Sequence, residues 1–117
     1  MRTVTRIVID LDGTICELRQ VDQTYADVLP KQGVSEVINK LFQSGYYIII
    51  HTARHMKTCN NDVVMVRERI EKITIEWLNQ YNIPYHEIVF GKPYGDLYID
   101  DLAFRFDSWY TIEKSLL

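Results

Sequence analysis

The sequence predicts an α/β fold built on a parallel sheet, and three observations support this prediction. Residues 7–9 form a β-branched apolar run close to the N-terminus, as in a buried strand of a parallel sheet. Further short apolar runs at residues 46–50 and 88–90 read as strands and alternate with helical patterns along the chain. Those helical patterns place apolar residues three and four positions apart over residues 34–42 and 62–80.

The first strand ends abruptly in two carboxylates, Asp10 and Asp12, followed by Gly13 and Thr14. Ligands of open α/β sheets bind beyond the carboxyl ends of the strands, so this is where a site is expected. Alternate residues of an extended chain share one side, which lets Asp10 and Asp12 face one cavity. Two neighbouring carboxylates repel, and oxygen ligands without a His or Cys cluster suit Mg²⁺ as the compensating cation. The alternative is an ordinary acidic turn, because Asp and Gly both favour turns.

Length and composition limit the class of protein. The chain has 117 residues, which is enough for a single domain over residues 1–117 and too few for a second folded lobe. Its net charge of −3 argues against a nucleic-acid partner, because affinity for phosphate backbones comes from Lys and Arg. Cys16 and Cys59 form no metal-ligand or redox spacing, and without a signal peptide the expected location is the cytoplasm. No apolar run approaches the length of a membrane span.

The first half of the chain continues from the acidic motif into a long loop or hairpin. Residues 15–33 show no sustained periodicity, and loops of this length in compact domains tend to be functional lids. The helix that follows ends at Ser44-Gly45, as a helix C-cap would. After the strand at residues 46–50 comes Thr52, whose hydroxyl can donate a hydrogen bond. Taken alone, Thr52 is more simply explained as a strand-end residue or a helix cap.

The second half of the chain adds a lysine and an acidic pair. The strand at residues 88–90 runs into Gly91-Lys92-Pro93, a defined turn that carries Lys92. Residues 97–99 predict a fourth strand that ends in Asp100 and Asp101. Asp96 is a competing acidic residue, but it precedes this strand. The aromatic tail predicts a terminal helix that starts near residue 107 or 108 and packs against the sheet.

These motifs, in this order, resemble those of the haloacid dehalogenase (HAD) superfamily of phosphohydrolases. The resemblance covers residues 7–101 and implies a three-layer, Rossmann-like core without a separate cap domain. It implies that Asp10 is the nucleophile, that Asp12 is the general acid and base, and that Thr52 and Lys92 surround the phosphate. It also implies Mg²⁺ as cofactor. The implied metal ligands are Asp10, the backbone carbonyl of Asp12, and the pair Asp100 and Asp101, with Asp101 the first choice for the direct contact.

The same resemblance implies residues that contact the substrate, namely Gly13, Thr14, Ala53 and Arg54. We expect Arg54 to bind the leaving group at the mouth of the site, because its planar guanidinium suits carboxylates and vicinal hydroxyls. The alternative is that the turn containing Arg54 is only a solvated basic surface. With no cap, water exclusion has to come from the loop at residues 15–33, from a neighbouring subunit of a homo-oligomer, or from the substrate.

A narrower resemblance is to the small phosphatases encoded with capsular polysaccharide biosynthesis. It is carried by short phrases at residues 50–54, 76–78, 83–85 and 91–93. Together the resemblances imply a Mg²⁺-dependent phosphomonoester hydrolase that forms an aspartyl phosphate. The implied substrate is a small-molecule phosphate ester, specifically a sugar phosphate of polysaccharide biosynthesis. The alternatives are a polynucleotide 3′-phosphatase, a phosphotransferase and a non-catalytic phosphate-binding module.

Overall fold

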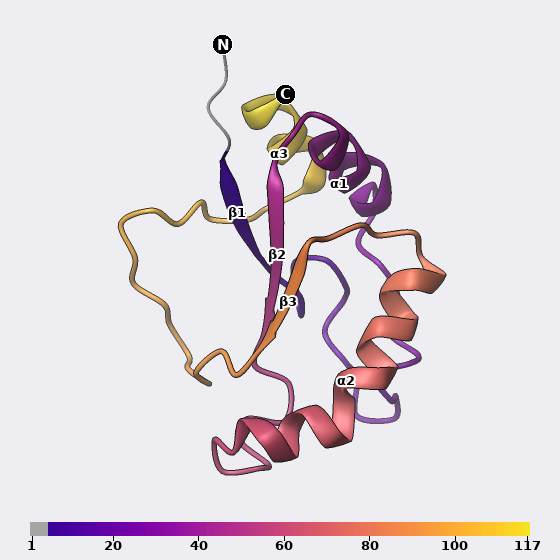
Figure 1. Cartoon of the computed structure of the whole chain (residues 1–117), viewed down its shortest axis with the longest axis vertical. Coiled ribbons are helices and arrows are strands. Elements are labelled where there is room, and N and C mark those ends of the chain that lie inside the picture. Colours follow the sequence, from indigo (N-terminus) through magenta and orange to yellow (C-terminus); the bar gives the residue numbers. More distant parts are fainter. Residues whose placement is uncertain (1–4) are drawn as a thin grey trace.

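The computed structural model describes residues 5–117, which form a parallel sheet and flanking helices (Figure 1). The sheet has the order β1-β2-β3, and both neighbouring pairs of strands are parallel. None of the helices in the described residues is long and apolar enough to cross a bilayer. The elements are β1 (Arg6–Asp10), α1 (Val34–Gln43), β2 (Tyr47–Thr52), α2 (Val63–Gln80), β3 (Glu87–Phe90) and α3 (Trp109–Leu116).

The helices form where the apolar spacing predicts them. In α1 the buried residues are Val34, Val37, Ile38 and Leu41, which lie on one face of the helix. In α2 the Asp62 carboxylate accepts a hydrogen bond from the Met65 backbone N–H at 3.3 Å and so caps the helix start. The long α2 then buries the stripe Val66, Ile70, Thr74, Trp77 and Leu78.

The two faces of the sheet differ in their cover. Ile9, Ile48 and Ile50 are buried in the main core with apolar residues of α1 and α2. On the opposite face, Val8 of β1 is 60% exposed and Val89 of β3 is 39% exposed. Strands of parallel sheets are usually buried on both faces, so the exposure of these residues is unusual.

The predicted loop at residues 15–33 is confirmed, and it is anchored by two buried tryptophans. The indole N–H of Trp77 in α2 donates to the Val28 carbonyl at 2.8 Å. The indole N–H of Trp109, at the start of α3, donates to the Thr14 carbonyl at 2.7 Å. The terminal helix begins where the sequence predicts, and it packs beside α1 through the 2.6 Å ion pair of Lys40 and Glu113. These contacts hold the turn after β1 against α3 and the following loop against α2.

The predicted fourth strand at residues 97–99 is wrong, because these residues form no strand in this structure. They belong to an extended stretch that leaves the end of β3, projects from the body of the molecule and returns to α3 (Figure 1). Their apolar side chains face solvent, with Leu97 71% and Ile99 91% exposed. Among the tail aromatics, Trp109 is buried as expected, but Phe104 and Tyr110 are 54% and 67% exposed.

Candidate active site

Three predicted site residues come together at the carboxyl ends of the strands. Asp10 ends β1, Thr52 ends β2, and Lys92 follows the last residue of β3 by two positions. The backbone N–H groups of Gly91 and Lys92 both donate to the Thr52 carbonyl, at 3.2 and 3.1 Å. Gly91 has a φ of 108°, and a Cβ there would lie 2.9 Å from a Val63 methyl carbon. Glycine at this position therefore permits the turn that positions Lys92.

Asp10 and Lys92 form the first half of the site. The Lys92 ammonium donates to Asp10 Oδ1 at 3.1 Å, and both side chains are only partly exposed. Burial raises the pKa of Asp10, and the nearby Asp12 carboxylate raises it further, while Lys92 acts in the opposite direction. Oδ2 of Asp10 has no hydrogen bond within the described part of the chain. One Asp10 oxygen is thus held by a cation, and the other is available to a ligand.

Asp12 forms the second half, and both of its oxygens are held. The Arg54 Nε donates to Oδ1 at 2.8 Å, and the Thr52 hydroxyl donates to Oδ2 at 3.0 Å. The Thr52 hydroxyl oxygen in turn accepts the Arg54 backbone N–H at 3.1 Å. Thr52 and Arg54 therefore fix the direction of the Asp12 carboxylate more tightly than Lys92 alone fixes Asp10.

Arg54 does not lie at the mouth of the site, so its expected position is wrong. Its side chain is 0% exposed, and it donates to the Thr74 hydroxyl at 3.1 Å and to Cys16 Sγ at 3.5 Å. The Tyr25 ring covers its guanidinium, with 4.2 Å from Cζ to the ring centroid. We call Asp12, Thr52, Arg54 and Thr74 the Arg54 network. In this arrangement Arg54 cannot touch a leaving group, because its polar atoms are used within the protein.

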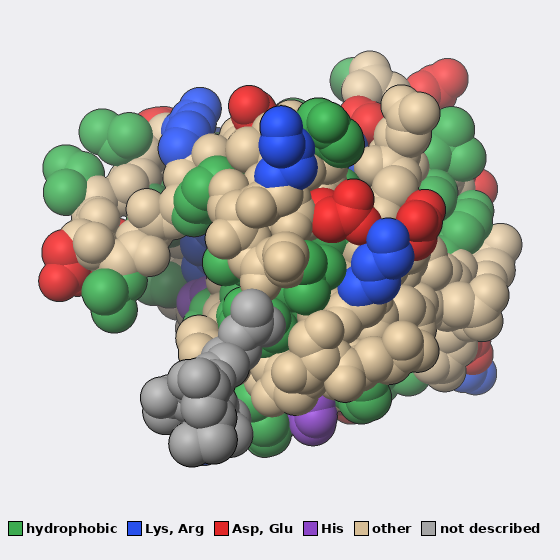
Figure 2. Space-filling view, turned by 90° about the horizontal axis from the view of Figure 1, so that it is seen from above, with side chains coloured by type: hydrophobic (Ala, Val, Ile, Leu, Met, Phe, Trp, Pro, Cys, Tyr) green, Lys and Arg blue, Asp and Glu red, His purple; other side chains and the backbone are tan. Residues whose placement is uncertain are grey.

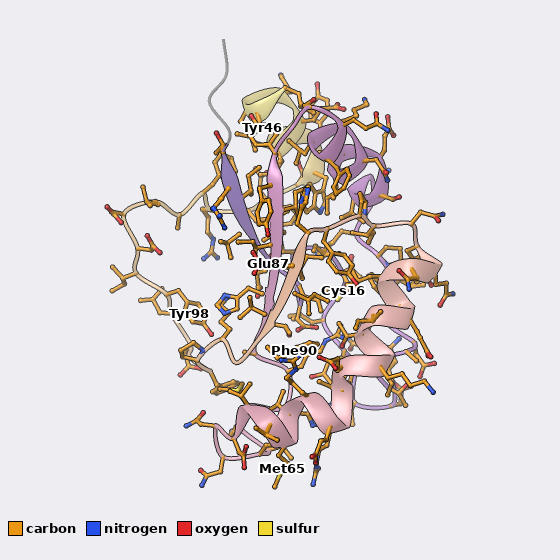
Figure 3. The ribbon with its side chains drawn as sticks, viewed as in Figure 1. Cys16, Tyr46, Met65, Glu87, Phe90 and Tyr98 are labelled. Atoms are coloured by element: carbon orange, nitrogen blue, oxygen red, sulfur yellow. The ribbon has the colours of Figure 1, made fainter. Side chains whose placement is uncertain are left out.

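Cys16 contacts the Arg54 network, because its Sγ accepts from Arg54 Nη2 at 3.5 Å, and Figure 3 shows it between β3 and α2. Its side chain is buried, and burial together with the adjacent Asp12 carboxylate raises its pKa to about 12. The thiol therefore stays protonated at neutral pH and acts as a packing residue rather than a nucleophile.

The other residues expected to contact the substrate occupy the turns beside these two carboxylates. Gly13 has a φ of 86°, and its N–H donates to the Cys16 carbonyl at 2.8 Å. The Thr14 N–H donates to the Leu11 carbonyl at 3.3 Å, which closes the turn after β1. Ala53, between Thr52 and Arg54, packs against a small core formed by Met56, Cys59 and α2 residues. No structural finding assigns these three residues to a substrate, so their role stays a prediction.

The acidic pair is not brought to the site. Asp100 and Asp101 are exposed on the projecting stretch, and Asp100 Oδ1 accepts only the local Leu102 N–H, at 2.8 Å. Within residues 5–117, no group of three or more His, Cys, Asp or Glu side chains is arranged to hold a metal ion. Asp10 and Asp12 are both paired with cations, and further carboxylates are needed before this chain presents a Mg²⁺ site of the expected kind.

A cavity of about 400 Å³ adjoins the Arg54 network on the α2 side. Its basic side chains are the charged Arg19 and Arg69 and the imidazole of His55, and no carboxylate lines it. Burial lowers the pKa of His55, and Arg69, Arg54 and Arg19 lower it further, as expected in a positive environment. The cavity is lined by Arg19, Gln23, Thr24, Tyr25, His55, Thr58, Arg69, Ile70 and Ile73.

Sequence reasoning missed the residues that hold Arg54. The position of Thr74 could have been noticed in the sequence, because it is a polar residue four positions after Ile70 on the buried stripe of α2. A buried hydroxyl requires a hydrogen-bond partner, which predicts a polar group facing that position. Tyr25 gave no such signal, because it lies in the aperiodic loop and its role depends on how that loop folds back.

Comparisons with solved structures find proteins of similar fold. No protein-family model matches the sequence, and no curated protein matches it. A structural-genomics target from Vibrio cholerae is 32% identical and has a TM-score of 0.80, and the match covers 96% of this chain and 98% of the other. A D,D-heptose 1.7-bisphosphate phosphatase from B. bronchiseptica, complexed with magnesium and phosphate, is 17% identical with a TM-score of 0.54. That match covers 86% of this chain and 54% of the phosphatase.

The third comparison is with a chain of the Pnkp1/Rnl/Hen1 RNA repair complex, which is 23% identical with a TM-score of 0.53. The match covers 97% of this chain and 31% of that one. Together the neighbours show that the fold is the predicted α/β class, a HAD-like core with a parallel sheet and no separate cap. The narrower resemblance to capsular phosphatases stays a prediction.

Proposed function

We propose that this chain hydrolyses phosphomonoesters. It belongs to the same family as the Vibrio cholerae protein, and it has a HAD-like core. The observation that carries the proposal is the pairing of Asp10 with Lys92 at the carboxyl edge of a parallel sheet, beside the fixed carboxylate of Asp12. At the coarser level, the phosphatase neighbours support a phosphatase-type enzyme.

Asp10 is the nucleophile in this proposal. Oδ2, the oxygen that Lys92 does not hold, attacks phosphorus, and the bond from phosphorus to the leaving oxygen breaks. The products of this step are an aspartyl phosphate and an alcohol. Lys92 is placed to move its hydrogen bond from the carboxylate to a phosphoryl oxygen, which keeps a positive charge beside the group being transferred.

Asp12 supplies and removes the proton in this proposal. Because Arg54 holds Oδ1, the oxygen that carries the proton is Oδ2, which faces the Thr52 hydroxyl. That hydroxyl can rotate and accept from protonated Oδ2 as readily as it donates to the ionised form. Asp12 first protonates the departing alkoxide and then takes a proton from the water that attacks the aspartyl phosphate. Arg54 thereby determines which oxygen takes part in proton transfer.

Mg²⁺ dependence is part of the proposal, supported by the magnesium and phosphate bound to the neighbouring phosphatase. The residues gathered in one chain do not fit a complete Mg²⁺ site, because they supply two carboxylates that are already paired with cations. A requirement for Mg²⁺ therefore needs Asp100 and Asp101 to reach Asp10, and no catalytic step above is derived from the metal.

In this proposal the leaving group lies in the cavity beside the Arg54 network. The residues of this cavity take over the role that the sequence analysis gives to Arg54. Arg19, His55 and Arg69 favour a leaving group that carries hydroxyls or a second anionic group, as sugar phosphates do. The cavity volume suits a small molecule. A polynucleotide 3′-phosphatase is the second candidate, because one neighbour belongs to an RNA repair complex. The negative net charge of the chain is unfavourable to it.

A phosphate-release assay tests the proposal. The substrates are a set of sugar phosphates and sugar bisphosphates, 3′-phosphorylated oligonucleotides and a generic aryl phosphate, each with Mg²⁺ and with a chelator. We expect release from sugar phosphates with Mg²⁺, and loss of release in Asp10→Asn by about 1,000-fold or more, since the amide is not nucleophilic. Mass spectrometry of quenched enzyme should find the phosphoryl group on Asp10. A phosphoryl group on Ser, His or Cys, or full activity of Asp10→Asn, would contradict the proposal.

A further inference from the structure

The cavity beside the Arg54 network has an unbalanced positive charge. Arg19 from the loop at residues 15–33 and Arg69 from α2 line the same space of about 400 Å³, and no carboxylate lines it. By contrast, Lys40 of α1 pairs with Glu113 of α3 at 2.6 Å, and Figure 2 shows basic and acidic side chains next to each other on that face of the molecule. Two guanidinium groups without acidic partners favour an anionic ligand.

Both arginines keep donors available to a ligand. The Arg19 Nη1 donates to the backbone carbonyls of Gln20 and Gln23 at 3.1 and 2.9 Å, and these bonds hold the side chain against its own loop. Within residues 5–117 the Nε and Nη2 of Arg19 form no hydrogen bond, and the Arg69 guanidinium forms neither a hydrogen bond nor an ion pair. A guanidinium stays charged at neutral pH, so these donors remain suited to an anion.

His55 shows that the charges of the two arginines act on one space. Burial lowers the pKa of His55, and Arg69, Arg54 and Arg19 each lower it further. Its ring also lies 5.7 Å from the ring of Tyr25, which lines the same cavity. An anion bound between the arginines would offset their charge and raise the pKa of His55 again.

The cavity offers few acceptors to the hydroxyl groups of a neutral sugar. Gln23 is the one carboxamide in its lining, and its Oε1 already accepts the Gln20 backbone N–H at 2.9 Å. The Thr24 hydroxyl donates to Asp27 Oδ2 at 3.0 Å, and Asp27 does not line the cavity. Donors therefore outnumber free acceptors, which suits an anionic group better than a neutral hydroxyl.

Tyr25 determines how the cavity is related to the reacting carboxylates. Its ring covers the Arg54 guanidinium at 4.2 Å and also lines the cavity. Arg54 in turn donates to Asp12 at 2.8 Å, so two side chains in series separate Asp12 from the cavity. A phosphate at Asp10 and an anion in the cavity therefore have to be joined by a spacer of several bonds.

We propose that Arg19 and Arg69, with His55 beside them, bind a second anionic group of the substrate, and that this group lies at the far end of a small carbon skeleton from the phosphate that is hydrolysed. The second group is a phosphate or a carboxylate, because both match the planar fork of a guanidinium. Tyr25 and Ile70 offer apolar surface to the skeleton. The binding of an anion stands on the cavity alone, and its assignment to the substrate rests on the proposed function.

Titration with inorganic phosphate tests the anion site without any assay of activity. The ring signals of His55 are followed by NMR in Asp10→Asn and are assigned with His55→Gln. We expect these signals to move and saturate as phosphate is added, and the pKa of His55 to rise. Repeating the titration with acetate decides between phosphate and carboxylate as the preferred anion. Signals of His55 that respond to neither anion would overturn the site.

Arg69→Gln tests which arginine holds the anion. Arg69 is preferred to Arg19 because Arg19 also closes its own loop. We expect the affinity for phosphate to fall by about tenfold or more, as for one lost charged hydrogen bond. Arg67→Gln is the matched control, because Arg67 is another exposed arginine of α2 that pairs with Glu71 at 2.6 Å and does not line the cavity. Equal weakening by both variants would reduce the effect to net charge and overturn the site.

Related substrates test the assignment of the anion to the substrate. The set is a bisphosphate, a phosphorylated sugar acid and a monophosphate of one sugar, together with an aryl phosphate. We expect a substrate with two anionic groups to have the highest kcat/KM and Arg69→Gln to lower that value by about tenfold or more. Hydrolysis of the sugar monophosphate and of the aryl phosphate should change by less than about twofold. Arg69→Lys should recover part of the loss, because it keeps the charge.

Pyrophosphate adds a test of the spacer, because its two phosphoryl groups share one oxygen and cannot reach both places. We expect it to be a poor substrate that Arg69→Gln does not affect. Equal loss of activity by Arg69→Gln on every substrate would overturn the assignment.

Failure of the anion site and failure of the proposed function give different results. Phosphate that moves the His55 signals of a protein with no hydrolytic activity on any substrate would refute the proposed function and leave the anion site standing. An active enzyme whose His55 signals ignore both anions, and whose Arg69→Gln variant shows no preference among substrates, would refute the anion site alone.

Discussion

The Arg54 network and the projecting stretch at residues 94–104, which we call the arm, carry residues that the sequence assigns to one site, yet they differ in burial and in bonding. Arg54 is fully buried and bonded to Asp12, Thr74 and Cys16, so its neighbours determine its position. The arm is exposed, and the Tyr98 hydroxyl forms hydrogen bonds only within its own turn, to Gly95 and Pro93. The order of the motifs along the chain therefore predicts which residues belong to a site. Whether such a residue is held at the site depends on its buried contacts with other parts of the chain.

The comparison predicts opposite responses of the two regions to substitution. Arg54→Ala removes the buried partner of Asp12, and we expect it to lower the free energy of unfolding by about 3–5 kcal/mol, as for other broken buried ion pairs. Leu102→Ser, in the arm, should change the free energy of unfolding by less than about 0.5 kcal/mol. Denaturant unfolding at low protein concentration measures both.

Arg69→Ala is the matched control for Arg54→Ala, because Arg69 is an exposed arginine of α2. Its effect on stability should stay within about 0.5 kcal/mol. If Arg54→Ala proved as mild as Arg69→Ala, the Arg54 network would contribute little to the fold and the contrast with the arm would fail.

A smaller change sharpens the contrast within the Arg54 network. Thr74→Val keeps the shape of the buried side chain and removes the acceptor of the Arg54 Nη1 bond, which should cost about 1 kcal/mol or somewhat more. We also expect kcat/KM to fall, because Arg54 would hold the Asp12 carboxylate less firmly. An unchanged kcat/KM would show that Thr74 serves the fold and has no influence on Asp12.

The smallest expected effect concerns Asp10 itself. Its pKa in the folded chain is raised, chiefly by burial, so the unfolded chain ionises at a lower pH than the folded one. Ionised Asp10 therefore costs stability at neutral pH, and this cost disappears as pH falls below the unfolded value of 3.8. We expect Asp10→Asn to be more stable than wild type at pH 7 and equal to it near pH 3. Paired denaturation curves across that range measure the difference, and a variant less stable at pH 7 would contradict the sign.

Much of the fold and half of the site could be predicted from the sequence, for identifiable reasons. The apolar runs of β1, β2 and β3 and the spacing in α1 and α2 are local signals, and the carboxyl ends of the three strands bring Asp10, Thr52 and Lys92 together. Residues 97–99 show why the fourth strand could not be predicted in the same way. Their pattern is that of a strand, but a strand requires a partner edge within reach of its connection, and six residues do not supply it. Arg54 was misplaced for a related reason, since its burial depends on the distant Thr74.

The Arg54 network also has a consequence for the order of events in folding. Arg54 lies 42 positions from Asp12, 38 from Cys16 and 20 from Thr74, so its bonds join segments that are remote along the chain. Contacts between remote segments form only after the loops between them close, and this slows their formation. The orientation of Asp12 is therefore completed only when β1, the loop after β2, and α2 have docked. Recovery of activity during refolding should lag behind the recovery of helical signal, and the lag would report the docking of α2.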